Sequence, residues 1–147
     1  MDLSFLKWPI IIAVIVGVGW LMSSSGVNYM FNKFTAGTPG ADAKKDEINE
    51  LGLSRLGGYC LALFKYDKAM SIFQTALARY PQGKNALFIK YRMARCAEKL
   101  KDYSQAVDLL KELMDANAHA TDDRVPNNDN LDLRAEKLIE MHELEKR

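Results

Sequence analysis

The stretch that decides the fold is Leu56–Pro81, which reads LGGYCLALFKYDKAMSIFQTALARYP. It has small residues at Gly57, Ala69 and Ala76, among others. Small residues let two antiparallel helices approach closely, and Phe73 fills the space between them. Pro81 cannot continue a helix, so it ends the second one. The stretch therefore predicts a helical hairpin whose turn lies at Tyr66 and Asp67.

A second, weaker copy of the pattern follows 37 residues further on. The paired positions are Gly57 and Ala94, Tyr66 and Tyr103, Ala69 and Ala106, and Phe73 and Leu110. Leu113 stands where the first copy has Ala76, and no proline closes the helix. Together the two copies predict four helices, at Ala43–Phe64, Lys68–Tyr80, Phe88–Leu100 and Ser104–Ala118. Asp42 or a neighbour can cap the first of them.

This pattern resembles the tetratricopeptide repeat (TPR), a helix-turn-helix unit with a period of about 34 residues. The sequence YPQGKNALFIKYRMARCAEKL at 80–100 also resembles that of bacterial envelope TPR proteins. The resemblance implies an all-α fold, a short TPR-like α-solenoid of two helical hairpins plus a C-terminal capping helix. Repeat 1 would occupy about 50–83, repeat 2 about 87–120 and the capping helix about 131–146. With only two repeats, the capping helix or a partner has to complete the core.

The predicted capping helix follows a polar loop, Thr121–Asn130. The loop lacks the order of acidic residues and the central glycine of a calcium loop, so we expect a solvated turn that ends in a helix cap at Asn130 or Asp129. The side of the helix expected to pack on repeat 2 consists of Leu131, Ala135, Leu138 and either Met141 or His142.

The N-terminal segment is strongly apolar. Trp8–Met22 contains no charge, and Pro9–Met30 would form a helix about 33 Å long, against roughly 30 Å of hydrocarbon in a bilayer. We therefore expect an N-terminal transmembrane helix within an anchor at 1–35, a linker at 36–46 and the helical domain at 47–147. A cleaved signal with a site near Ser23 and Ser25 is one alternative. A buried core helix is another.

Small residues four apart in this segment suggest close contact with other membrane helices. The pairs are Ala13 with Gly17, and Gly19 with Ser23. The alternative is that glycine and serine are simply common in such helices. Lysines on the C-terminal flank favour a cytoplasmic domain. The short N-tail and the resemblance to envelope proteins favour a periplasmic one, and we expect the bacterial inner membrane with a periplasmic domain.

Composition and spacing indicate no catalytic chemistry. Lys7 and Lys33 are the only basic residues before Ala36 and Asp2 the only acidic one, so basic and acidic residues are equal in number from there on. Nucleic-acid binding is therefore not expected. His119 and His142 have no metal or triad spacing, and Cys60 and Cys96 fit buried thiols, with their pairing left open. We expect no enzyme, no cofactor, no metal and no small-molecule substrate.

The TPR resemblance implies a concave, protein-binding face formed by the first helix of each repeat. Its expected residues are Leu51, Ser54, Gly58, Leu61, Ala62, Phe88, Tyr91, Arg95 and Lys99. The small Gly58 and Ala62 suggest that the first half is apolar and open, and the carboxylate clamp of some family members is largely absent. We expect a scaffold or accessory subunit of a bacterial membrane protein complex. The alternatives are a periplasmic chaperone or quality-control adaptor with transient clients, and a face filled by the chain's own C-terminal helix.

Overall fold

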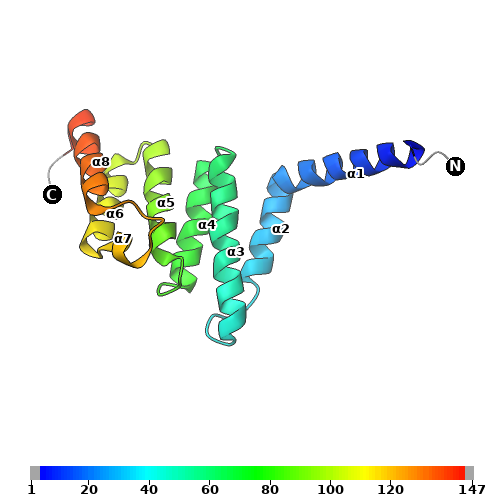
Figure 1. Ribbon diagram of the computed structural model, residues 1–147, viewed down its shortest axis with the longest axis horizontal. Helices are drawn as coiled ribbons and strands as arrows, with labels where there is room; N and C mark the ends of the chain where they lie inside the picture. The colour runs from blue at the N-terminus through cyan, green and yellow to red at the C-terminus, as the bar shows by residue number, and fades with distance from the viewer. Residues whose placement is uncertain (1–3, 145–147) are drawn as a thin grey trace. The chain divides into compact units, whose positions relative to one another are not determined.

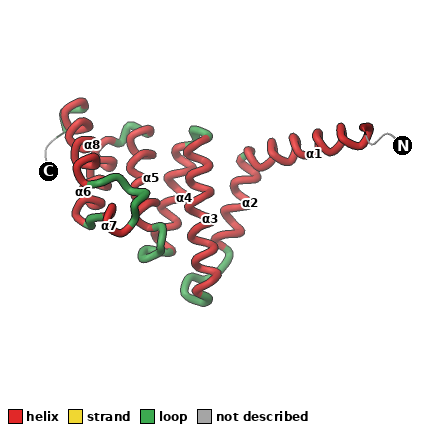
Figure 2. The backbone as a smooth tube through the Cα atoms, viewed as in Figure 1, coloured by secondary structure: helices red, strands yellow, loops and turns green. Residues whose placement is uncertain are grey.

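The computed structural model describes residues 4–144, with side chains described from Lys7 onward. All regular elements in this range are helices (Figures 1 and 2). They are α1 (Ser4–Met22), α2 (Ser24–Thr35), α3 (Ala43–Ala62), α4 (Tyr66–Arg79), α5 (Ala86–Lys99), α6 (Tyr103–Asp115), α7 (Ala118–Thr121) and α8 (Asn128–Met141). The chain divides into two compact units, Met1–Ala36 and Gly37–Arg147, which we describe separately.

The first unit corrects one expectation, because the apolar segment is not one continuous helix. The Ser23 hydroxyl donates to the Trp20 carbonyl oxygen and accepts from the Gly26 amide, so it ends α1 and caps α2. A Cβ at Gly26 would lie 2.8 Å from the Leu21 Cα, so only glycine fits against the end of α1. The two helices therefore meet at Ser23, with a bend of 69° between Lys7–Met22 and Ser24–Thr35.

Between residues 4 and 144, no single helix is both long and apolar enough to cross a membrane. Lys7–Met22 and Ser24–Thr35 satisfy the length and composition together, as a bent pair. The two helices differ in character. The described side chains of α1 are all exposed and almost all apolar, whereas α2 carries polar side chains at Asn28, Asn32 and Lys33.

The second unit is built on the predicted hairpins. The described α3 and α4 pack together, α5 packs on α4, and α5 and α6 form the second hairpin (Figure 1). Phe73 is fully buried against the Gly57 backbone, where an added Cβ would lie 2.6 Å from the ring Cδ1. Ala69, Ala76, Ala94 and Ala106 are also fully buried, as the small-residue pattern predicted.

Both hairpins turn in the same way. Phe64 and Lys101, which occupy equivalent positions in the two hairpins, have positive φ angles of 59° and 64°. After each of them, the next amide closes back onto the helix: Lys65 N donates to Cys60 O at 2.9 Å, and Asp102 N donates to Ala97 O at 2.9 Å. This pattern is a Schellman C-cap, which satisfies the carbonyl groups at the end of the helix.

The last helix ends with the same turn. Glu143 has a φ of 51°, and Leu144 N donates to Ile139 O at 3.0 Å. By its position relative to this turn, α8 therefore corresponds to the first helix of a third repeat, and it packs on α6. Glu136 occupies the position that is Gly57 in α3 and Ala94 in α5. It is exposed, because no described helix crosses α8 there.

Two details of the expected capping helix are wrong. Its N-cap is Asn127, whose side chain accepts from the Asn130 amide, and neither Asn130 nor Asp129 caps it. The helix ends at Met141, because Glu143 takes the left-handed turn. Leu131, Ala135 and Leu138 are buried as expected. Of the two alternatives for the next position, His142 is the one that packs on repeat 2: its ring stacks on Tyr103 with the ring centroids 3.4 Å apart, whereas the Met141 side chain is exposed.

Candidate functional site

The repeated turn places three helices in one register. Residues six positions before each left-handed residue are Gly58, Arg95 and Lys137, and residues ten positions before it are Ser54, Tyr91 and Leu133. Arg92 of α5 donates to the Ser54 carbonyl oxygen of α3, and Arg134 of α8 donates to Glu98 of α5, so side-chain contacts join the three helices. We call the surface formed by these sides of α3, α5 and α8 the first-helix face.

The predicted binding residues fall on this face with different exposures. Ala62, Arg95 and Lys99 are exposed, and Ser54 is buried. The half-buried members are Leu51, Gly58, Leu61, Phe88 and Tyr91. Their role in binding stays a prediction.

The expected open, apolar first half is wrong, because Arg92 fills it. A Cβ at Gly58 would lie 3.0 Å from the Arg92 Cζ, so the guanidinium lies directly over this glycine. Arg92 Nη1 donates to the Ser54 carbonyl oxygen at 3.2 Å. The small residue on α3 therefore makes room for an arginine of α5 and leaves no apolar opening.

The guanidinium groups of two arginines lie over the Phe88 ring. The Arg92 Cζ lies 4.2 Å from the ring centroid and the Arg124 Cζ lies 4.6 Å from it, both within cation–π range. Arg124 comes from the segment between α7 and α8. Its Nε and Nη2 donate to the two Asp122 carboxylate oxygens at 2.8 and 2.7 Å, and its Nη1 donates to Asn85 Oδ1 at 3.0 Å.

The electrostatics of the two arginines differ. Hydrogen bonds from Arg124 lower the pKa of the Asp122 carboxyl, so this pair is charged and matched. Burial lowers the pKa of the Arg92 guanidinium, and the positive charges of Arg124 and Arg95 lower it further. Over residues 7–144, no carboxylate lies within ion-pair distance of Arg92 or Arg95.

The far end of the face contains a hollow of about 430 Å³ between α5 and α8. Arg134 of α8 bonds Glu98 of α5 through two hydrogen bonds of 2.6 and 2.7 Å. Leu133 and Met141, which also line the hollow, are 65% and 63% exposed. The residues around it are Glu98, Asn130, Leu133, Arg134, Lys137, Leu138, Met141 and His142.

The comparison with protein families bears directly on this geometry. Residues 61–125 match the tetratricopeptide repeat family. The match begins near the end of α3, includes the whole of α4, α5 and α6, and ends shortly before α8. It supports the TPR assignment of the second unit, and TPR units are protein-interaction modules. Neither the curated proteins nor the solved structures gave a match.

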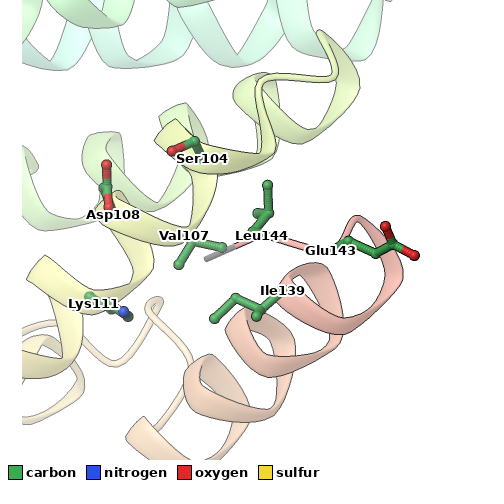
Figure 3. A pocket seen from close by; sticks show the side chains of 7 residues that line it. All are labelled: Ser104, Val107, Asp108, Lys111, Ile139, Glu143 and Leu144. Atoms are coloured by element: carbon green, nitrogen blue, oxygen red, sulfur yellow. The ribbon is translucent and has the colours of Figure 1, made fainter. Parts of the chain in front are cut away.

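The second unit has another groove, on a different side of α8. Val107, Ile139 and Leu144 provide its apolar side chains, and Figure 3 shows α6 and the end of α8 on either side of it. It is smaller, at about 230 Å³, and Ser104, Asp108, Lys111 and Glu143 complete its lining. Lys111 thus belongs to a surface separate from the hollow at Leu133.

The two cysteines of the second unit are buried. Cys60 and Cys96 are free and buried, which confirms the expectation of two buried thiols. Burial raises the pKa of the Cys60 thiol and raises that of Cys96 to about 11. Both thiols are therefore protonated at neutral pH and poor nucleophiles. In the described chain, no group of three or more His, Cys, Asp or Glu side chains could hold a metal ion.

Sequence reasoning missed Arg92 and Arg124, and it considered the C-terminal helix only as an element that fills the face, not as one that extends it. Phe88 and Arg92 are four positions apart on one helix, a spacing that brings side chains together, so this pair could have been found. The position of Arg124 over the same ring depends on how the segment before α8 folds back. No local pattern predicts it.

The four small residues expected to pack membrane helices lie in the first unit. An added Cβ at Gly17 or Gly19 would meet nothing within 4 Å, and Ala13 is exposed. The Ser23 hydroxyl is already bonded to Trp20 and Gly26. Helix packing at Ala13, Gly17, Gly19 and Ser23 stays a prediction.

Proposed function

We propose that this chain is a membrane-anchored TPR scaffold or accessory subunit that holds a protein partner within a bacterial membrane complex. The observation that carries the proposal is α1 on the same chain as a TPR unit. Ile10, Ile15 and Val16 are 57%, 64% and 65% exposed, as are their apolar neighbours along this helix. A continuous apolar surface of this kind needs lipid or a partner around it.

The bend at Ser23 gives the anchor a specific form. The length and apolar composition of a span are met by Lys7–Met22 and Ser24–Thr35 together, as a bent pair. In the proposed arrangement α1 enters the membrane and α2, with its asparagines and Lys33, leaves it at an angle. Lys33 and Tyr29 would then lie at the membrane surface.

A fixed partner is favoured over transient clients. The chaperone or adaptor alternative depended on an open apolar half-groove, and Arg92 occupies that space. A single partner can match a face of defined charges, whereas a promiscuous binder needs an adaptable apolar surface. The two candidates differ in stoichiometry: a subunit co-purifies with one partner in a fixed ratio, an adaptor with many in low amounts.

The test is the mass of the particle that the full chain forms when extracted from its native membrane in a mild detergent. We expect a particle larger than the 16.6 kDa chain and its detergent belt. Reversing a charge on the first-helix face, with Arg95→Glu, should release the partner, whereas Lys111→Glu in the second groove should not. A monodisperse monomer in the unmodified protein would contradict the subunit proposal.

The side of the membrane is proposed to be periplasmic and is tested by labelling. Ala41→Cys places a thiol in the exposed linker and avoids Gly40, whose φ of 88° disfavours other residues. Both native thiols are buried, so the new thiol is the reactive one. Labelling of intact cells by an impermeant reagent after outer-membrane permeabilisation is expected. Labelling only after inner-membrane lysis would place the unit in the cytoplasm.

A further inference from the structure

The first-helix face carries positive charge that the described chain does not balance. Its basic residues without an ion pair in the described range are Arg92, Arg95, Lys99 and Lys137. Two carboxylates of the face are already used: Glu98 bonds Arg134 through both oxygens, and Asp122 bonds Arg124 through both oxygens. Because basic and acidic residues are equal in number from Gly37 onward, this excess is local to the face.

One of these charges is held in place before any ligand arrives. The Phe88 ring lies under the Arg92 guanidinium at 4.2 Å, and the Ser54 carbonyl oxygen accepts from Nη1. Arg95 is one turn further along α5 and exposed, so the two guanidinium groups are neighbours on the helix. A guanidinium fixed in this way loses little conformational freedom on binding a carboxylate, and its planar fork matches carboxylate geometry.

Apolar side chains alternate with the charges along the face. Tyr91 lies between Arg92 and Phe88 in sequence and is half-buried. Leu133 and Met141 of α8 are exposed on either side of Lys137. A nucleic acid or a plain polyanion would leave these apolar side chains unused, whereas a polypeptide with acidic and apolar residues uses both kinds.

We propose that the first-helix face binds an acidic, leucine- or other aliphatic-rich segment of a partner protein. Carboxylates of that segment meet Arg92 and Arg95, and an aliphatic side chain enters the hollow beside Leu133 and Met141. This inference rests on the proposed scaffold function and names the chemistry of its partner. Leu133, Lys137 and Met141 of α8 extend the predicted binding surface from two helices to three.

The test uses the full chain in a nonionic detergent and three short fluorescein-labelled peptides of equal length. Each peptide alternates leucine with one other residue: glutamate, glutamine or lysine. Fluorescence anisotropy measures the Kd of each, with empty micelles as the blank. We expect the glutamate peptide to bind at least about tenfold more tightly than the glutamine peptide, since hydrogen bonds to charged groups exceed neutral ones by about this factor.

Three variants locate the site. Arg92→Gln and Arg95→Gln should each weaken the glutamate peptide by about tenfold and leave the glutamine peptide unchanged. The matched control is Lys111→Gln, which removes one positive charge from the second groove and should change the Kd less than about twofold. Circular dichroism reports whether Arg92→Gln still folds. If it does not, Arg95→Gln decides alone, because this side chain is exposed.

The inference is overturned if the glutamate and glutamine peptides bind equally, if no peptide binds, or if Lys111→Gln weakens binding as much as Arg95→Gln. A labelled oligothymidylate of the same charge is the last arm. If it binds as tightly as the glutamate peptide and with the same dependence on Arg95, the face is a general polyanion site and the proposal is wrong. The particle mass in detergent is independent of these results, so a failed peptide test does not itself count against the scaffold.

Discussion

Two adjacent glycines in α3 allow the packing of the first hairpin to be tested directly. Gly57→Ala places a Cβ against the Phe73 ring, 2.6 Å from Cδ1. Gly58→Ala places a Cβ against the Arg92 guanidinium, 3.0 Å from Cζ. Both substitutions are in the same helix, so alanine raises the helix propensity and restricts the unfolded chain equally in the two variants. The difference between them reports packing alone.

The magnitudes follow from what each neighbour can do. Replacing glycine by alanine within a helix contributes about 1 kcal/mol in either case. Phe73 is fully buried, and its ring would have to move by about 1 Å to reach an ordinary contact distance. Overpacking of this kind costs about 1–3 kcal/mol. Arg92 can instead swing towards solvent and lose about 1 kcal/mol of cation–π and hydrogen-bond energy.

We therefore expect Gly57→Ala to be less stable than Gly58→Ala by up to about 2 kcal/mol, because the cost of about 1–3 kcal/mol at Phe73 is offset by the loss of about 1 kcal/mol at Arg92 in the other variant. Gly58→Ala should stay close to the unmodified protein. The assay is urea unfolding of the fragment Gly37–Arg147, followed by far-ultraviolet circular dichroism. With an m-value of about 1–3 kcal/mol/M, a difference of about 1 kcal/mol separates the midpoints by about 0.3–1 M. A midpoint for Gly57→Ala above that of Gly58→Ala would show that Gly57 is not at the helix crossing and that the repeat register is wrong.

Three further predictions concern charges and thiols of the second unit. Arg134→Met should lower stability by about 1 kcal/mol through loss of the two hydrogen bonds to Glu98, and a double-mutant cycle with Glu98→Gln should show coupling between the two positions. Folding lowers the pKa of Asp122, so this carboxylate stabilises the protein above its unfolded pKa of about 3.8, and the stabilisation disappears as the pH falls through the lower folded pKa. Asp122→Asn should therefore remove this part of the pH dependence of the unfolding free energy, measured from pH 6 to pH 2. The Cys60 and Cys96 thiols should resist alkylation at pH 8 in the folded protein and react quickly in urea, and fast labelling without denaturant would contradict their burial.

Much of the second unit was predictable because close helix packing leaves a local signature. The contact between α3 and α4 needs small residues at Gly57 and Ala69 and a large one at Phe73. The size of each residue is set by its neighbours in the same hairpin. The repeat of this pattern further along the chain then predicts the second hairpin. The cap at Asp42 was expected for the same local reason, and the side chain accepts from Lys44 N and Lys45 N.

The break between α1 and α2 was not predicted, although the serines at which it occurs are evident in the sequence. Hydropathy averages over a window, and Ser23, Ser24 and Ser25 barely change that average. The break depends on a few hydrogen bonds, in which Ser23 bonds both the end of one helix and the start of the next. A composition argument describes how apolar a segment is but does not say whether its backbone is continuous.

The sequence by itself determined the four helices of the two hairpins, their pairing and the buried alanines, because these depend on residues close together in the chain. Only the tertiary structure decided the character of the first-helix face. Arg92 of α5 covers Gly58 in the preceding hairpin, and Arg124 reaches back to Phe88 at the start of α5. Which charges are matched there depends on how the segment before α8 folds back over α5. Contacts at such separations along the chain come from the packing of whole helices, and no periodicity in the sequence encodes them.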